Sequence, residues 1–336
     1  MVPETRAAIA RVLAAFARSR TDAEPCFRAW LNEYGALYGA RFLDPGEREV
    51  RALRSQYDAP ESAGFHELLF CAHTWFAFAV RSTLARHGLV DAAEESHFSW
   101  FRDDAGPLVH PPAGDGSRDV FQPLYLALVP RAVRHALGEY YTPEWLAELI
   151  LDEAGYRGEP EMRLLDPACG SGVFLVLAIG RSREQLRRAG ISEDEAAGRI
   201  VRSIHGFELN PLAALAARAN YRLALGEGGR SIPARSIPVR RIDALLSPGE
   251  IEPFDLVVGN PPWVRWDYLT EKYRQATLPL WKKYGLFSLT GFQARLGGGK
   301  KDLSMLFTYA CADRYLKPGG RLGFLITQEV FKSKSA

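Results

Sequence analysis

Two sequence patterns alternate in the second half of this 336-residue chain, and their order leaves few folds open. Short apolar runs occupy residues 162–165, 204–208, 239–242, 254–258 and 321–326. Between them, helical periodicity marks residues 173–188, 211–225 and 303–316. Strands that alternate with helices form a parallel sheet with helices on both faces. We therefore predict an α/β fold for residues 121–336.

The first hundred residues predict an all-α domain. Apolar residues recur at three- and four-residue steps around Ile9 and again around Trp30, which is typical of amphipathic helices. Residues 65–87 are apolar on most of a helix circumference, so we predict a buried central helix with His73 as a core histidine. A segment rich in Pro, Gly and Asp follows. The chain thus divides into a helical domain (1–102), a linker (103–120) and an α/β domain (121–336).

Three local expectations concern the α/β domain. Helices are predicted at residues 124–137 and 144–153, the second with Thr142 as N-cap and Pro143 as first helical residue. Residues 268–299 contain many aromatic side chains and end in three glycines, which predicts a mobile loop over a site. Residues 317–321 predict the turn before the last strand.

Charge and cysteine content limit the class of protein. The 42 Lys and Arg nearly balance the 40 Asp and Glu, so a nucleic-acid partner would need a local basic patch. The longest uncharged apolar stretch, residues 68–80, is too short to span a membrane. We predict a cytoplasmic protein with no metal site, because its cysteines lie far apart and form no CxxC or Cys/His cluster: Cys26, Cys71, Cys169 and Cys311.

Basic residues also occur on predicted loops near the carboxyl ends of the strands. They could contact phosphate, although a solvated loop is the simpler interpretation of each. These residues are Arg230, Arg235, Arg240, Arg241, Lys282, Lys283, Lys300 and Lys301.

A glycine-rich turn follows the first strand of the α/β domain. Asp166 ends the strand, and the small residues up to Gly172 lead into a helix. Such a turn lets a ligand approach bare backbone and the N–H groups of a helix N-terminus. A turn that needs glycine only for its dihedral angles explains the pattern about equally well.

Two further acids, Glu208 and Asp243, end the next two strands. Carboxyl ends of parallel strands share one edge of the sheet, where such folds bind ligands. A carboxylate at the position of Glu208 can accept hydrogen bonds from both hydroxyls of a ribose. The turn lacks a GxGxxG pattern, and Glu208 lies much further from it than in dinucleotide folds, which disfavours a nicotinamide cofactor. Taken singly, each acid could be a solvated strand end or a turn cap.

The most informative segment is Asn260-Pro261-Pro262-Trp263, which directly follows an apolar strand. The two prolines end the strand and make a rigid turn. The amino group of a nucleobase is a poor nucleophile, because its lone pair is delocalised into the ring. The Asn260 side-chain oxygen and the Pro261 carbonyl can each accept an amino hydrogen and so localise that lone pair. Trp263 offers a flat face for an unstacked base.

In this order, the segment 138–143 (GEYYTP), the turn 166–172 (DPACGSG) and the NPPW segment resemble the gamma group of adenine-N6 DNA methyltransferases, particularly those of restriction-modification and phage-defence systems. The resemblance covers residues 124 to 336. It implies a Rossmann-like S-adenosylmethionine-dependent methyltransferase sheet, S-adenosylmethionine as methyl donor, and double-stranded DNA with a flipped adenine as substrate.

The resemblance also implies roles for individual residues. By this resemblance, the methionine part of the cofactor would be surrounded by Tyr140, Thr142, Asp166 and Gly170, with Ala168 in the same turn. Glu208 would bind the ribose, and Asp243 the adenine amino group of the cofactor. Two apolar side chains would sandwich that adenine: Leu209 and Phe307. The target adenine would be held by Asn260, Pro261, Pro262 and Trp263.

The sequence departs from the family pattern at three places. Ala244 replaces a larger apolar residue, and Gln328 stands where proline is frequent. The family's sheet continues with an antiparallel hairpin and then a target-recognition domain, whereas this sequence stops soon after the fifth predicted strand. We therefore expect a truncated sheet, with DNA recognition supplied by a separate specificity or C-terminal subunit.

Alternative functions stay open at this point. The same turn serves methyltransferases that act on a protein glutamine or on an RNA base, although the segment 138–143 favours DNA. An inactive or split cofactor-binding fragment is a second alternative. A nicotinamide oxidoreductase is the weakest.

Overall fold

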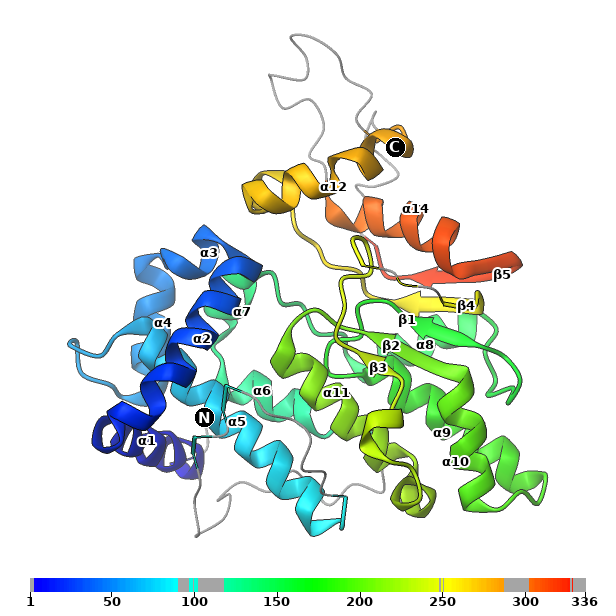
Figure 1. Ribbon diagram of the computed structural model, residues 1–336, viewed down its shortest axis with the longest axis horizontal. Helices are drawn as coiled ribbons and strands as arrows, with labels where there is room; N and C mark the ends of the chain where they lie inside the picture. Colours follow the sequence, from blue (N-terminus) through cyan, green and yellow to red (C-terminus); the bar gives the residue numbers. More distant parts are fainter. Residues whose placement is uncertain are drawn as a thin grey trace.

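The computed structural model describes residues 3–89, 97–98, 100–101, 118–247, 249, 251–286, 302–326 and 328. Its centre is a five-stranded sheet in the order β3-β2-β1-β4-β5, in which every neighbouring pair is parallel (Figure 1). The strands are β1 Leu164–Asp166, β2 Ile204–Phe207, β3 Val239–Arg240, β4 Phe254–Gly259 and β5 Leu316–Phe324. The predicted α/β fold with a parallel sheet is confirmed.

Alternating side chains of β1 explain how helices come to cover both faces of the sheet. Leu164 packs into a core with four helices, which are α8 Glu144–Glu153, α9 Val173–Arg188, α10 Glu193–Ser203 and α11 Pro211–Ala224. Leu165 points to the opposite core, which contains α12 Glu271–Lys283 and α14 Leu303–Tyr315. Both leucines are fully buried, as expected for a central parallel strand.

Several predicted boundaries shift. β5 begins at Leu316, not Arg321, and the predicted turn at 317–321 lies within it as an irregularity, because Phe254 pairs with Leu316 while Leu256 pairs with Arg321. Helix α10 was not predicted, although Ser192 caps it by accepting a hydrogen bond from the N–H of Glu195.

The helices of the first part pack around one apolar core. They are α1 Pro3–Arg18, α2 Arg20–Tyr38, α3 Ala40–Leu43, α4 Glu47–Tyr57, α5 Phe65–Arg86, α6 Phe121–Leu128 and α7 Arg131–Leu137. Leu212, Ala216 and Ala219 of α11 belong to the same core. In Figure 1, α11 accordingly lies between the blue and cyan helices and the strands. Helix α11 therefore packs against both parts of the chain.

Two predictions about the helices near residue 130 and residue 143 are wrong. The single helix predicted at 124–137 is interrupted, since Pro130 is extended (ψ 146°) and precedes α7. The helix predicted at 144–153 is present with those bounds as α8, but its N-cap residue is Pro143 rather than the predicted Thr142. In both cases a proline with extended ψ stands outside the helix.

The linker predicted at 103–120 falls largely on residues 103–117, which lie outside the described residues. Asp119 and Val120, at its end, are buried. The Asp119 side chain accepts hydrogen bonds from the N–H groups of Phe121 and Gln122 (3.0 and 2.9 Å), and so caps α6. The division into domains stays a prediction.

Helix α5 is long and apolar enough to cross a membrane by composition, but 72% of its most apolar window is buried in the helical core. His73 on this helix is fully buried, as predicted. Its Nδ1 accepts a hydrogen bond from Trp30 Nε1 (3.2 Å), and its Nε2 lies 3.5 Å from the Tyr125 hydroxyl. Burial lowers the pKa of His73 to about 3, so the ring is neutral.

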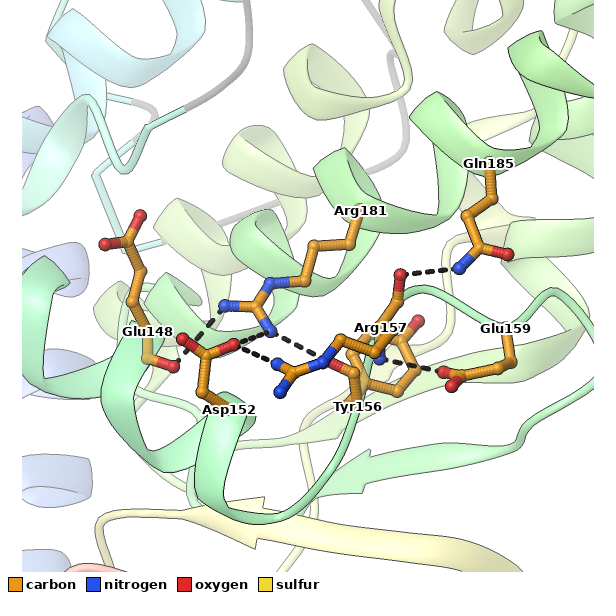
Figure 2. Close-up of polar contacts among 7 residues, drawn as sticks. All are labelled: Glu148, Asp152, Tyr156, Arg157, Glu159, Arg181 and Gln185. Carbon is orange, nitrogen blue, oxygen red and sulfur yellow. Dashed lines mark hydrogen bonds and ion pairs between the residues drawn. The ribbon is translucent and has the colours of Figure 1, made fainter.

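Polar contacts tie α8 to α9 (Figure 2). The Arg181 guanidinium on α9 donates to Asp152 Oδ1 at 2.9 Å and to the Tyr156 carbonyl at 2.7 Å. Gln185 Nε2 donates to the Arg157 carbonyl at 2.7 Å. These bonds hold the C-terminal end of α8 and the loop that leads into β1.

Candidate functional site

A cavity of about 510 Å³ opens at the carboxyl ends of the strands. Its walls come from α2, the segment 138–142, the turns after the strands, α12 and α14. Asn260 and Pro262 line the cavity. All nine residues predicted to bind a cofactor line it as well: Tyr140, Thr142, Asp166, Ala168, Gly170, Glu208, Leu209, Asp243 and Phe307. Pro261 and Trp263 do not line it. The structure thus brings the predicted residues together, and their roles stay predictions.

Asp166 ends β1 and is only 1% exposed. Its Oδ1 accepts a hydrogen bond from the N–H of Ala168 at 3.1 Å, whereas its buried Oδ2 has no partner among the described residues. Burial, together with the negative charge of Glu208, raises the pKa of Asp166 to about 8. A Cβ on Gly259 would lie 2.5 Å from Asp166 Oδ1, so glycine is required there. The unpaired oxygen suits a ligand that carries an amine.

The turn after Asp166 has the backbone shape that a close ligand needs. Gly170 and Gly172 have φ values of 56° and 97°, which favour glycine. The N–H of Cys169 donates to the Phe207 carbonyl (2.9 Å), which holds the turn against β2. Ser171 donates its hydroxyl to Asp119. Hydrogen bonds to Phe207 and to Asp119 therefore fix the position of the turn.

Glu208 follows β2, and both of its carboxylate oxygens accept backbone hydrogen bonds. Oε2 accepts from the N–H of Gly170 and Oε1 from the N–H of Asn210, each at 2.8 Å. Burial nevertheless raises its pKa. A carboxylate oxygen can accept two hydrogen bonds, so each oxygen has capacity for one ribose hydroxyl.

Asp243 follows β3, and its Oδ1 accepts hydrogen bonds from the N–H groups of Leu245 (2.8 Å) and Leu246 (3.0 Å). Tyr273 of α12 lies beside it: burial, and then the charge of Asp243 and a hydrogen bond to it, raise the pKa of the Tyr273 hydroxyl. The sequence patterns did not single out Tyr273.

The mobile loop predicted at 268–299 is wrong for residues 271–283, which form α12. The Thr270 side chain accepts a hydrogen bond from the N–H of Tyr273, and the fully buried Trp281 anchors the helix. Pro279 inside the helix obscured the helical pattern. Residues 287–299 lie outside the described part of the chain.

Asn260 follows β4 and faces the cavity. Its Nδ2 donates to the Tyr140 carbonyl at 3.4 Å, while its buried Oδ1 has no partner among the described residues. The Trp263 ring stacks on the Tyr140 ring, with centroids 5.8 Å apart and an interplanar angle of 30°. Tyr140, predicted beside the cofactor, therefore also belongs to the aromatic surface predicted for the target base.

Glu139 and Asn210 are further lining residues that the sequence patterns did not single out. Two tyrosine hydroxyls, of Tyr38 and Tyr125, donate to the Glu139 carboxylate at 2.8 Å each. Asn210 Nδ2 donates to the Tyr38 hydroxyl (2.6 Å) and to Glu139 (3.3 Å), and the Tyr34 hydroxyl donates to Asn210 Oδ1 (3.2 Å). Burial raises the pKa of Glu139. Only the tertiary structure brings these five polar residues together, because they lie on four separate segments.

Of the six basic loop residues that the structure describes, three form ion pairs. Arg241 pairs with Glu33 of α2, Lys283 pairs with Asp313 at 2.6 Å, and Arg230 pairs with Glu227 at 2.6 Å. Lys300 and Lys301 lie outside the described residues. Among those residues, no group of three or more His, Cys, Asp or Glu is placed to hold a metal ion.

A parallel sheet in the order 3-2-1-4-5, with acids after three consecutive strands around one cavity, defines a Rossmann-like methyltransferase fold. The family model described as "N-6 DNA Methylase" matches residues 117–335. The chain belongs to this family of N-6 DNA methylases.

Individual relatives agree with this assignment. The chain is 34% identical to Type II methyltransferase M.BstVI of Geobacillus stearothermophilus over 45% of this chain and 29% of that protein. It is 31% identical to Type II methyltransferase M.PaeR7I of Pseudomonas aeruginosa over 60% of this chain and 37% of that protein. The chain thus spans about a third of the length of these curated relatives.

Among solved structures, the ATP-dependent Type ISP restriction-modification enzyme LlaBIII bound to DNA is similar, with a TM-score of 0.54. The match covers 92% of this chain and 24% of that one. At 15% identity, this likeness concerns the fold alone.

Proposed function

We propose that this chain transfers a methyl group from S-adenosylmethionine to the N6 amino group of adenine in double-stranded DNA, as part of restriction-modification or phage defence. The observation that carries the proposal is the buried Oδ1 of Asn260, an acceptor without a partner among the described residues, in a cavity that also holds the unpaired Oδ2 of Asp166. The first oxygen fits an amino group of the substrate and the second an amine of the cofactor.

The residues around the cavity fit this cofactor. Asp166 offers a carboxylate to its ammonium group, Glu208 offers two oxygens to its ribose, and Asp243 lies where the resemblance places its adenine. Leu209, 38% exposed, and Phe307 supply apolar surface for that adenine. When bound, S-adenosylmethionine supplies an electrophilic methyl group. The chain itself binds and orients the two partners.

Asn260 is the residue that we expect to activate the target amino group. Its Nδ2 is engaged by the Tyr140 carbonyl, which orients the amide so that Oδ1 stays available as an acceptor. An adenine amino hydrogen donated to Oδ1 leaves the nitrogen lone pair less delocalised and directed at the methyl group. Pro261 and Pro262 keep the turn rigid, and the Pro261 carbonyl can accept the second hydrogen. Trp263 supports a base that has left the duplex.

The expected partners follow from the reaction. The substrate is double-stranded DNA with a flipped adenine, so the protein acts in the cytoplasm and needs no membrane. For sequence recognition we also propose a separate specificity or C-terminal subunit as a partner.

The test is Asn260→Ala, with the exposed Asn32→Ala on α2 as a matched control. Loss of the acceptor should lower the methylation rate by about 100-fold or more, because such positioned groups act on the transition state. Binding of S-adenosylmethionine, measured by calorimetry, should stay the same in both variants. Near-normal methylation by Asn260→Ala would overturn the proposal.

The substrate class is tested in the same incubation. DNA, RNA and protein are supplied together with labelled cofactor, and the products are digested and separated by mass spectrometry. N6-methyladenine in DNA is the expected product. Methylated glutamine, or methylated bases in RNA alone, would replace the proposed substrate by one of the alternatives.

A further inference from the structure

Four basic side chains gather on α4 and α7, and we call them the α4/α7 patch: Arg48, Arg131, Arg134 and His135. Arg131 Nε donates a hydrogen bond to His135 Nε2 at 3.3 Å. After burial, the charges of Arg131, Arg134 and Arg48 lower the pKa of His135. Helices α4 and α7 pack against each other, so the three guanidinium groups act on one imidazole.

The charges of the exposed Arg48 and Arg131 are not neutralised by an ion pair among the described residues, whereas the charge of Arg134 acts on the Glu139 carboxylate. Among the residues that the structure describes, no carboxylate forms an ion pair with Arg48, Arg131 or Arg134. Of the acids nearby, Glu47 on α4 lies 3.9 Å from Arg51, and Glu139 is engaged by two tyrosine hydroxyls. Arg48 and Arg131 are exposed, and Arg134 Nε donates to the Val129 carbonyl.

The patch lies beside the residues proposed to hold the target base. The His135 ring is 4.8 Å from the Tyr140 ring, which in turn stacks on Trp263. Gly138, which ends α7, approaches Val264 so closely that a Cβ on it would lie 3.0 Å from Val264 Cγ2. Helix α7 thus packs directly against the segment that follows the Asn260–Trp263 turn.

We propose that the α4/α7 patch binds the phosphodiester backbone of duplex DNA next to the flipped adenine. This rests on the proposed function, because it requires a base from a duplex to enter beside Trp263. A flipped base stays covalently attached to its flanking phosphates, so the backbone must pass the mouth of the cavity. Arginine is well suited to phosphate, and the nearly balanced total charge makes a local patch the main source of attraction.

The experiment compares the wild-type chain with the double variant Arg48→Gln/Arg131→Gln. Arg134 and His135 are left intact, since Arg134 also holds a backbone carbonyl. Binding of a fluorescent duplex of about 30 base pairs is measured by anisotropy at several salt concentrations between roughly 50 and 200 mM. The matched control is Arg187→Gln/Arg188→Gln, two exposed arginines that pair with Glu184 at the far end of α9.

Two lost phosphate contacts should weaken duplex binding about 10-fold and flatten the slope of log K against log salt by about 1.8. The control should keep the wild-type slope, and both variants should keep the wild-type melting temperature and cofactor affinity. The proposal is overturned if the double variant binds the duplex as tightly as the wild type, or if the control variant loses as much duplex affinity as the double variant. It is also overturned if the wild-type chain does not bind the duplex.

Failure of this proposal and failure of the proposed function are distinguishable. The salt slope reports on the patch alone, and it can be measured on Asn260→Ala, which should still bind the duplex. The methylated product reports on the reaction. If the chain shows the expected salt slope but forms no N6-methyladenine, the phosphate-binding role of the α4/α7 patch stands and the proposed methyl transfer fails.

Discussion

At the scale of single residues, Asp166 combines deep burial with an unpaired oxygen. Its pKa of about 8 in the folded chain lies above the ordinary value of 3.8. The folded chain therefore holds a proton that the unfolded chain releases above pH 3.8. By linkage, this residue's contribution to the free energy of unfolding decreases as the pH rises from 3.8 to about 8. A positively charged ligand group beside Asp166 lowers its pKa again, because it stabilises the ionised carboxylate.

We therefore predict that the affinity for S-adenosylmethionine rises between pH 6 and pH 8, by up to about 10-fold per pH unit, as one proton is released on binding. Calorimetry in buffers of different ionisation enthalpy counts that proton directly. Asp166→Asn should bind more weakly at pH 8 and lose most of this pH dependence. Glu208 and Glu139, whose pKa values are also raised, remain in this variant, so an unchanged pH dependence would assign the proton to them.

At the scale of elements, a hydrogen-bonded network joins the helical part to the cofactor side of the cavity. Tyr38 of α2 contacts both Glu139 and Asn210, and the N–H of Asn210 holds Glu208. Helix α2 is therefore a wall of the site as well as part of the helical core.

Tyr38→Phe tests this link, with Tyr57→Phe as control. Both tyrosines are 8% exposed, but Tyr57 donates to the Leu128 carbonyl away from the cavity. Each change should lower the free energy of unfolding by about 1–3 kcal/mol in urea titrations, since a buried acceptor loses its donor. Only Tyr38→Phe should also weaken cofactor binding, by a few-fold. Equal cofactor affinities in the two variants would contradict a positioning role for Tyr38.

At the scale of the whole molecule, α11 is shared by two cores. Ala216 packs with the helical part and Ala217 with the sheet, and Asn220 Nδ2 donates to Asp119 Oδ1 at 2.5 Å. Neither core is complete without this helix, so opening one exposes apolar surface of the other.

We predict that the full chain unfolds in one cooperative transition, even though its sequence divides into a helical and an α/β part. Scanning calorimetry should give one peak, with equal calorimetric and van't Hoff enthalpies. Two resolved peaks would show that the parts unfold independently and that the shared helix does not couple them.

The sequence by itself determined the parallel sheet and the order of the site segments. The apolar strands predicted at 162–165 and 204–208 and the acids that end them are local patterns, and parallel strands necessarily bring their carboxyl ends to one edge. Strand-end positions such as Asp166 and Glu208 were therefore predictable from neighbours in the chain, as was the turn at Asn260.

Only the tertiary structure decided what surrounds those residues. Glu139, Asn210 and Tyr273 belong to the cavity because distant segments pack there, and no local pattern encodes a contact between Tyr38 and Asn210. The same holds for the α4/α7 patch, in which Arg48 lies far in sequence from Arg131 and Arg134. Burial and charge depend on neighbours in space, so the raised pKa of Asp166 and the unpaired oxygen of Asn260 appear only once the chain is folded.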